Sequence, residues 1–184
     1  MPEQLITRPL AARTATPDTG TWTVQPGRTR AAFAVRTCGL KVVRGAIPVC
    51  GGLARVGPRG VVTLIRADLD LSALDTGNSR RDAELRKPHL LDSAAASSMT
   101  FVATAISRQA TGWVAQGELR LGSMSCPLDL LTGPIPAAYG TTVRVRATGV
   151  LDRTPLGIRA SRFVIGRLVA ITIDAWLEPP GRRP

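Results

Sequence analysis

The sequence predicts an all-β fold, an antiparallel barrel of about eight strands with one short helical insertion near residues 78–87. Apolar and polar residues alternate with a period of two along several segments, as they do in half-buried strands. Glycine- and proline-containing turns separate these segments, and no helical crossovers alternate with them as they would in a parallel sheet. A barrel of about eight strands has an interior that is either just filled or holds one ligand.

The alternating segments can be traced in chain order. In the first, Phe33 and Val35 share one face, while Ala34 and Arg36 take the other. In the next, the odd positions 61 to 71 form the apolar row. Successive side chains of a strand point to opposite faces, so each segment offers one face to the barrel interior. The strands predicted in this way are residues 30–37, 61–71, 98–106, 112–121, 141–150 and 168–178.

The later segments repeat the pattern. Between residues 98 and 106 the expected inward row is Phe101, Ala103 and Ala105. Turn signals stand between the segments and predict short connections. They are Gly51-Gly52, Gly57-Pro58, Thr111-Gly112 and residues 133–140.

The chain length of 184 residues suits one domain with a core of its own. Residues 1–20 are rich in Thr and Pro and are expected to form a flexible N-terminal extension. Residues 21–178 are the predicted barrel domain, and residues 179–184 a basic C-terminal tail. No internal repeat is visible.

Residues 74–92 read LDTGNSRRDAELRKPHLLD and begin like the segment around the catalytic carboxylate of aspartic proteases. That chemistry needs two carboxylates that share a proton. The residues after the Asp-Thr-Gly triplet instead predict a short basic helix from Asn78 to Lys87, with Ser79 and Asp82 spaced as a capping box and Pro88 as its stop. Leu85 is its expected inward anchor, so a helical insertion is predicted here and not a protease.

The chain carries 24 basic and 13 acidic residues, a net charge of +11. Nearly all the bases are arginines, scattered along the chain, because Lys41 and Lys87 are the only lysines. A positive field favours phosphate head groups, nucleic acid or a membrane surface, but genome composition explains the pattern equally well. Aromatic residues make up only 4%, which argues against stacking platforms for single-stranded nucleic acid, and no specific nucleic-acid partner is expected.

Catalytic and metal-binding patterns are missing from the sequence. The three cysteines, Cys38, Cys50 and Cys126, contain no Cys-x-x-Cys pair, and His89 is the only histidine. Asp68 and Asp70 share the polar face of a strand, where solvated carboxylates are common. We therefore expect no enzyme, no cofactor and no metal.

Two further sequence features bear on location. No early segment combines a charged start, an apolar run and a small-residue cleavage site, and no apolar run reaches the roughly 18 residues of a membrane span. We expect a cytoplasmic protein, with any membrane contact peripheral.

Many residues of the apolar rows are small, among them Ala67, Ala103, Ala115 and Ala147. A barrel lined in this way does not easily reach interior packing density, which predicts an elongated apolar lumen. Two alternatives stay open: the barrel is narrow where these residues lie, or inner and outer rows are exchanged on some strands. The expected lumen residues are Phe33, Val35, Ile65, Ala67, Phe101, Ala103, Trp113, Ala115, Val143, Val145, Ile171 and Ile173.

A set of short motifs occurs in a characteristic order between residues 20 and 178. These are Gly20-Thr21-Trp22, residues 30–36, Val43-Arg44-Gly45, Asp75-Thr76-Gly77 with Arg81-Asp82 and Leu85-Arg86, Met99-Thr100-Phe101, Leu151-Asp152-Arg153 and Leu156-Gly157-Ile158. In this order the chain resembles the YceI-like family of lipocalin-like barrels, which are regarded as polyisoprenoid binders. The resemblance implies a barrel that holds an apolar ligand. It also places Asp75, Arg81 and Asp82 in a connection where their role is structural.

The chain departs from the family pattern at polar and aromatic positions. Thr37-Cys38 stands where a histidine usually comes after the first long strand, and Glu84 replaces the histidine of the Arg-Asp-x-His-Leu pattern. Leucines replace aromatic residues at 90, 91 and 156. Specificity for a particular head group is therefore not implied.

If the head group of the ligand is a phosphate, the arginines of the segment DRTPLGIRASR are the expected contacts, since a planar guanidinium forks onto phosphate oxygens. These are Arg153, Arg159 and Arg162. A solvated loop is the alternative for all three.

Three functions remain in competition. The leading one is non-enzymatic binding, sequestration or transport of an amphiphile with an isoprenoid or fatty-acyl chain in the lumen. The second is a module that binds an anionic surface or nucleic acid through its charge. The third is a filled barrel that serves as a protein-interaction or structural unit, with a homodimer among its forms.

Overall fold

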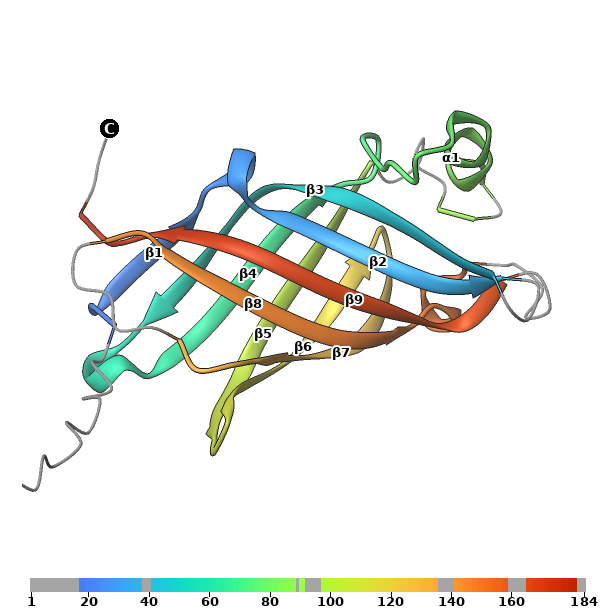
Figure 1. The fold of residues 1–184 in the computed structure, drawn as a ribbon. Helices are drawn as coiled ribbons and strands as arrows, with labels where there is room; N and C mark the ends of the chain where they lie inside the picture. Colours follow the sequence, from blue (N-terminus) through green and yellow to red (C-terminus); the bar gives the residue numbers. More distant parts are fainter. Residues whose placement is uncertain are drawn as a thin grey trace, which may run out of the picture.

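The computed structural model describes residues 17–37, 41–88, 90–91, 97–135, 141–158 and 165–181. Its strands form one antiparallel sheet that closes on itself (Figure 1). The strands are β1 (Gly20–Val24), β2 (Arg30–Thr37), β3 (Lys41–Val56), β4 (Val62–Asp70), β5 (Ser98–Gln109), β6 (Gly112–Leu121), β7 (Met124–Thr132), β8 (Val143–Asp152) and β9 (Ile165–Glu178). The helix α1 spans Ser79–Leu85, and the 3-10 turns η1, η2 and η3 span Pro26–Arg28, Pro58–Gly60 and Thr154–Leu156.

The nine described strands occupy eight positions around the barrel. Strands β1 and β2 both pair with β3 and with β9, so they act as one long strand interrupted by η1. From there each strand pairs with the next in the chain, and the β3–β4 and β2–β9 ladders complete the circle. The predicted antiparallel barrel of about eight strands is confirmed.

The ladder between β7 and β8 is short. Leu131 pairs with Thr148 and Thr132 with Ala147, whereas the β8–β9 ladder runs from Val143 to Asp152. This seam is therefore the place where backbone hydrogen bonds contribute least to the wall.

Irregularities in the ladders shift some side chains from the faces that simple alternation predicts. A bulge after Ala103 turns Ala105 outward and brings Ile106 toward the interior. Another irregularity, between Arg55 and Val56, leaves Thr63 exposed and puts Val62 inside. The expected inward positions of Ala105, Val61 and Thr63 were wrong.

Gly51-Gly52 was expected to be a turn, but it lies within β3. The register against β4 shifts between Val49 and Gly51, so the glycines bend the strand without ending it. A β-carbon on Gly52 would come 2.6 Å from the carbonyl oxygen of Arg66, an approach that only glycine permits. The turns predicted at Gly57-Pro58 and Thr111-Gly112 are present.

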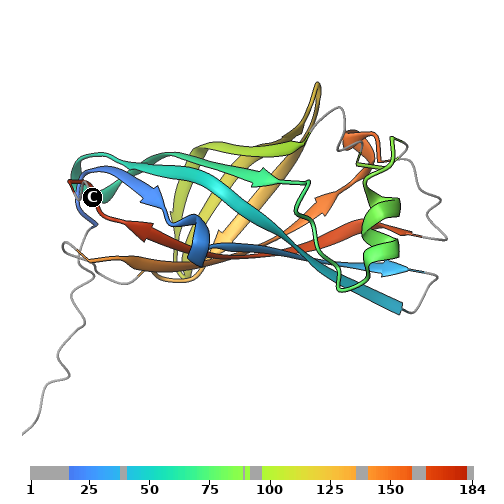
Figure 2. The same cartoon turned by 90° about the horizontal axis from the view of Figure 1, so that it is seen from above.

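The insertion between β4 and β5 contains α1, as expected, although its cap differs. Asn78, not Ser79, is the N-cap, and its side-chain oxygen accepts the backbone N–H of Arg81 at 3.0 Å. Asp82 turns back toward Thr76, whose N–H and hydroxyl both donate to it. Figure 2 shows α1 across one end of the barrel.

The same insertion is tied to the wall. The nitrogens Nε and Nη2 of Arg81 donate to the hydroxyl and carbonyl oxygens of Thr76, each at 2.8 Å. Asp75 forms a backbone bridge with Ala46 of β3, and its carboxylate accepts the N–H of Gly77. Arg81 and Asp82 thus both bind Thr76, a geometry that favours the structural role implied by the resemblance.

The core consists of the inward side chains of the barrel. One large cluster extends along most of the barrel and includes Leu71, Leu156 and Cys126, which are almost fully buried. A second cluster of Trp22, Val56 and Val143 lies at the end of the barrel away from α1.

Among the described residues, none of the helices has the length and apolar character needed to cross a membrane.

Candidate ligand-binding cavity

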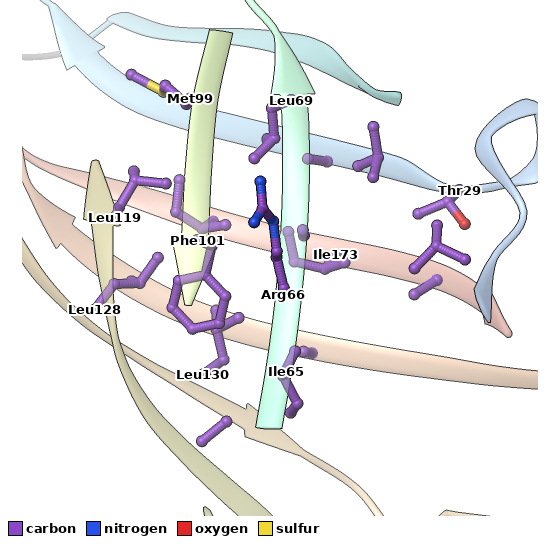
Figure 3. Close-up of a pocket in the computed structure, with 18 of the residues that line it drawn as sticks. Thr29, Ile65, Arg66, Leu69, Met99, Phe101, Leu119, Leu128, Leu130 and Ile173 are labelled. Atoms are coloured by element: carbon purple, nitrogen blue, oxygen red, sulfur yellow. The ribbon is translucent and has the colours of Figure 1, made fainter. Parts of the chain in front are cut away.

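A cavity of about 290 Å³ runs through the barrel interior. One water molecule needs only about 10–15 Å³ on a comparable measure, so this space is much more than a packing defect. Every strand contributes to its lining, and Figure 3 shows side chains from several of them converging on it. The interior of the barrel is therefore a lumen and is not filled by its own side chains.

The lining is almost entirely apolar. The polar residues on it are Thr29, Arg66, Thr132 and Arg153. All four make contacts within the protein. The hydroxyl oxygen of Thr29 accepts the N–H of Trp176, and Thr132 donates to the Gly133 carbonyl. Arg66 pairs with Asp68 on the outer face, and Arg153 donates to backbone carbonyl oxygens. Such a lining suits an apolar chain and gives a buried charge nothing to pair with.

The predicted lumen residues lie almost without exception on the cavity. All of them except Ala103 line the cavity. Ala103 is fully buried within the wall cluster. The structure adds Ile47, Ile106, Leu128 and Leu130 to the lining. Leu128 and Leu130 alternate with exposed Pro127 and Asp129, a signal that the sequence contained.

Glycines help to keep the lumen open. Phe33 of β2 stands opposite Gly45 of β3, and a β-carbon on Gly45 would come within 2.5 Å of the Phe33 ring. The missing side chain leaves room for the ring to lie against the wall instead of across the lumen.

Each end of the lumen has an apolar closure. At one end Trp22 is only 2% exposed and packs with Val56 and Val143, while its indole N–H donates to the Asp18 carbonyl at 2.8 Å. At the other end Leu74, Leu85 and Leu91 of the β4–β5 connection line the cavity. Leu85 is therefore the inward anchor that the sequence predicted.

Arg153, a head-group candidate, is engaged with the backbone. It is 3% exposed, and its three nitrogens donate to the carbonyl oxygens of Gly166, Ile158 and Ile165, with distances of 2.9 Å to Gly166 and 2.7 Å to Ile165. Burial lowers the pKa of the guanidinium. This geometry favours a structural role for Arg153, which joins Ile158 to the start of β9, and its contact with a ligand head group stays a prediction. Arg159 and Arg162 lie outside the described residues.

The carboxylates singled out in the sequence lie on the outside of the wall. Asp68 accepts hydrogen bonds from Arg66 and from Thr100, and chiefly the Arg66 bond lowers its pKa. A hydrogen bond from Ser72 likewise lowers the pKa of Asp70. A carboxylic acid that acts as a general acid near neutral pH needs a raised pKa. The pKa values of Asp68 and Asp70 are lowered, so their environment does not suit that role.

Neither a protease pair nor a metal cluster is found in the described part of the chain. The triplet Asp-Thr-Gly occurs at residues 18–20 and again at 75–77. Gly20 pairs with Val56 and Asp75 with Ala46, ten residues apart on β3, or about 33 Å. The two carboxylates therefore do not share a proton. No three described His, Cys, Asp or Glu side chains gather to hold a metal ion.

Comparisons with known structures agree with this architecture. Burkholderia cenocepacia BcnA aligns with a TM-score of 0.70 and 13% identity, over 83% of this chain and 98% of BcnA. A polyisoprenoid binding domain from Saccharophagus degradans, implicated in plant cell wall breakdown, aligns with a TM-score of 0.64 and 14% identity, over 86% of this chain and 98% of that domain. A Campylobacter jejuni YceI protein aligns with a TM-score of 0.57 and 14% identity, over 68% and 78%. These likenesses concern the fold.

Sequence comparison gives the family. A search of curated proteins finds no match. The model of the YceI-like domain matches residues 22–177, nearly the whole barrel. The chain therefore belongs to the YceI-like domain family.

Proposed function

We propose that this protein is a non-catalytic carrier that binds a long-chain, polyisoprenoid-like or fatty-acyl amphiphile in its lumen. The observation that carries the proposal is the cavity of about 290 Å³ with an almost wholly apolar lining. Family membership and the likeness to a polyisoprenoid binding domain support it.

The energetics favour a long apolar chain. Burial of one methylene is worth about 0.8 kcal/mol, so ten carbons supply roughly 8 kcal/mol before the costs of association. Because the polar side chains of the lining already bind protein groups, the head group is expected to stay at an end of the barrel. The affinity then depends on chain length more than on head-group chemistry.

The test compares two substitutions that add the same ring to opposite faces. Ala115 of β6 lines the lumen, while Ala105 of the neighbouring β5 is exposed on the outside. Ala115→Phe should weaken binding of the fluorescent probe N-phenyl-1-naphthylamine at least about tenfold, because the ring takes the space of several methylenes. Ala105→Phe should leave binding unchanged.

Circular dichroism must show that both variants are folded, and Ala147→Leu offers a second lumen-filling change. A long-chain prenol should displace the probe from the wild-type protein. Equal probe affinity in the wild-type, Ala115→Phe and Ala105→Phe proteins would contradict the proposal.

A cytoplasmic location stays a prediction, which fractionation of cells checks.

A further inference from the structure

Charge is distributed unequally around the barrel wall. Strands β1, β2, β3, β8 and β9, here called the basic wall, carry eight basic and three acidic residues, a net charge of +5. Strands β4 to β7, the acidic wall, carry three basic and four acidic residues, a net charge of −1. The basic residues of the strands, although scattered in sequence, are thus concentrated on one side of the barrel wall.

The acids of the basic wall are largely neutralised by neighbours. Asp174 accepts hydrogen bonds from Arg144 and lies 3.7 Å from Arg146, and Asp152 pairs with Arg167. Arg36 of β2 and Arg44 of β3 are exposed, and no described carboxylate forms an ion pair with either. The surplus positive charge therefore faces solvent.

Large apolar side chains stand between these charges. Val150 of β8 is 60% exposed, Leu168 of β9 57% and Val42 of β3 43%. Small residues lie beside Val150 across the strands, since Val150 pairs with Ala170 and Ala170 with Ala34, while Val42 pairs with Arg36. Figure 1 looks onto β3, β2, β9 and β8, which lie side by side across the front of the barrel.

We propose that the basic wall docks on an anionic phospholipid membrane. Each Lys or Arg near such a surface contributes about 1 kcal/mol, and exposed apolar side chains add burial at the head-group level. The basic wall combines a positive charge, which complements anionic lipids, with exposed apolar side chains. The acidic wall also exposes Met124 and Leu131, but it has no surplus of positive charge. The proposal goes beyond binding of a chain in the lumen and does not depend on it.

Co-sedimentation with vesicles tests the docking surface. Phosphatidylcholine vesicles with and without phosphatidylglycerol are compared at about 0.1 M and about 0.5 M salt, where screening differs strongly. The double variant Arg36→Glu/Arg44→Glu changes the basic wall, and Arg108→Glu/Arg120→Glu changes the acidic wall. Each lowers the net charge by four, from +11 to +7, so the two variants carry the same net charge and change it on opposite walls.

The wild-type protein should bind the anionic vesicles at the lower salt concentration and leave neutral ones. Arg36→Glu/Arg44→Glu should weaken binding about 30-fold or more, Arg108→Glu/Arg120→Glu much less. Leu168→Asn, which keeps the charge, should weaken it roughly tenfold.

Equal losses in the two double variants would overturn the proposal, since net charge would then suffice. So would failure of the wild-type protein to bind anionic vesicles, or binding of duplex DNA in place of vesicles. The lumen is monitored separately with N-phenyl-1-naphthylamine. Arg36→Glu/Arg44→Glu should keep its probe affinity, so loss of docking and loss of the carrier function are distinguishable.

Discussion

The ring of Phe101 on β5 lies over Gly117 of the neighbouring β6, so that a β-carbon built on Gly117 would come 2.7 Å from the Cζ atom of Phe101. The same β-carbon would lie 2.5 Å from the carbonyl oxygen of Val102, which is part of the backbone and cannot turn away. Gly117→Ala should therefore lower the free energy of unfolding by about 1–3 kcal/mol. Urea denaturation measures it. Gly27→Ala, at a site with open space around the glycine, serves as the control and should change stability little.

Arg153 is expected to contribute to stability and not to ligand choice. Arg153→Leu leaves the carbonyls of Gly166, Ile158 and Ile165 without this donor, which should cost about 2–4 kcal/mol of unfolding free energy. The exposed Arg120, changed to Leu, should have a much smaller effect. An Arg153→Leu variant with nearly unchanged stability and sharply weaker ligand binding would instead support the predicted head-group role.

Thr76 and Asp82 are predicted to act as a unit that fixes the helical insertion. Asp82 is 7% exposed and accepts both the N–H and the hydroxyl of Thr76. Asp82→Ala and Thr76→Val should each destabilise the fold. The double variant should lose less than the sum, with a coupling energy of about 1–3 kcal/mol from a double-mutant cycle. Strict additivity would show that the two side chains are independent.

The cysteines should differ in reactivity. Cys126 is 1% exposed, and burial raises the pKa of its thiol to about 11, with Asp152 and Glu118 adding to the shift. At pH 8 only about one Cys126 in a thousand is then a thiolate, while Cys50 is exposed. Iodoacetamide treatment and peptide mass mapping should show modification of Cys50 in the native protein and of Cys126 only after unfolding. Comparable rates at both sites would contradict the buried position of Cys126.

The same raised pKa gives a direction for pH dependence. The folded protein holds the Cys126 proton more tightly than the unfolded chain does, so this contribution to stability is complete below about pH 9. It is lost as the pH rises from about 9 toward 11. A Cys126→Ser variant should show a shallower alkaline loss when urea denaturation is repeated across this pH range.

Alternation in the sequence predicted six strands of the barrel and most of the lumen residues, because a strand with one buried face must alternate. It did not predict β1, β3 and β7. The prediction from alternation failed where one strand of a pair carries an extra residue. After Ala103 a bulge exchanges the two faces, so that Ile106 points inward where Ala105 was expected. A bulge depends on the register of a partner strand distant in sequence, which a local pattern does not contain.

The roles of Gly51-Gly52 and of Arg153 also could not be predicted from the sequence. Gly51-Gly52 has the composition of a turn, and only pairing with β4 shows that it bends β3. Arg153 has the sequence context of a loop arginine, but the carbonyl oxygens that accept its hydrogen bonds belong to Ile158 and to the first residues of β9. The concentration of arginines on one wall likewise exists only once the strands are ordered around the barrel.

Native mass spectrometry of freshly purified protein, combined with solvent extraction, tests the central claim most directly. If the lumen is a carrier site, the protein should release an amphiphile with a long apolar chain in stoichiometric amount, or bind one after incubation with isoprenoid and fatty-acyl mixtures. An apo mass that persists after both treatments would contradict a carrier function for the cavity.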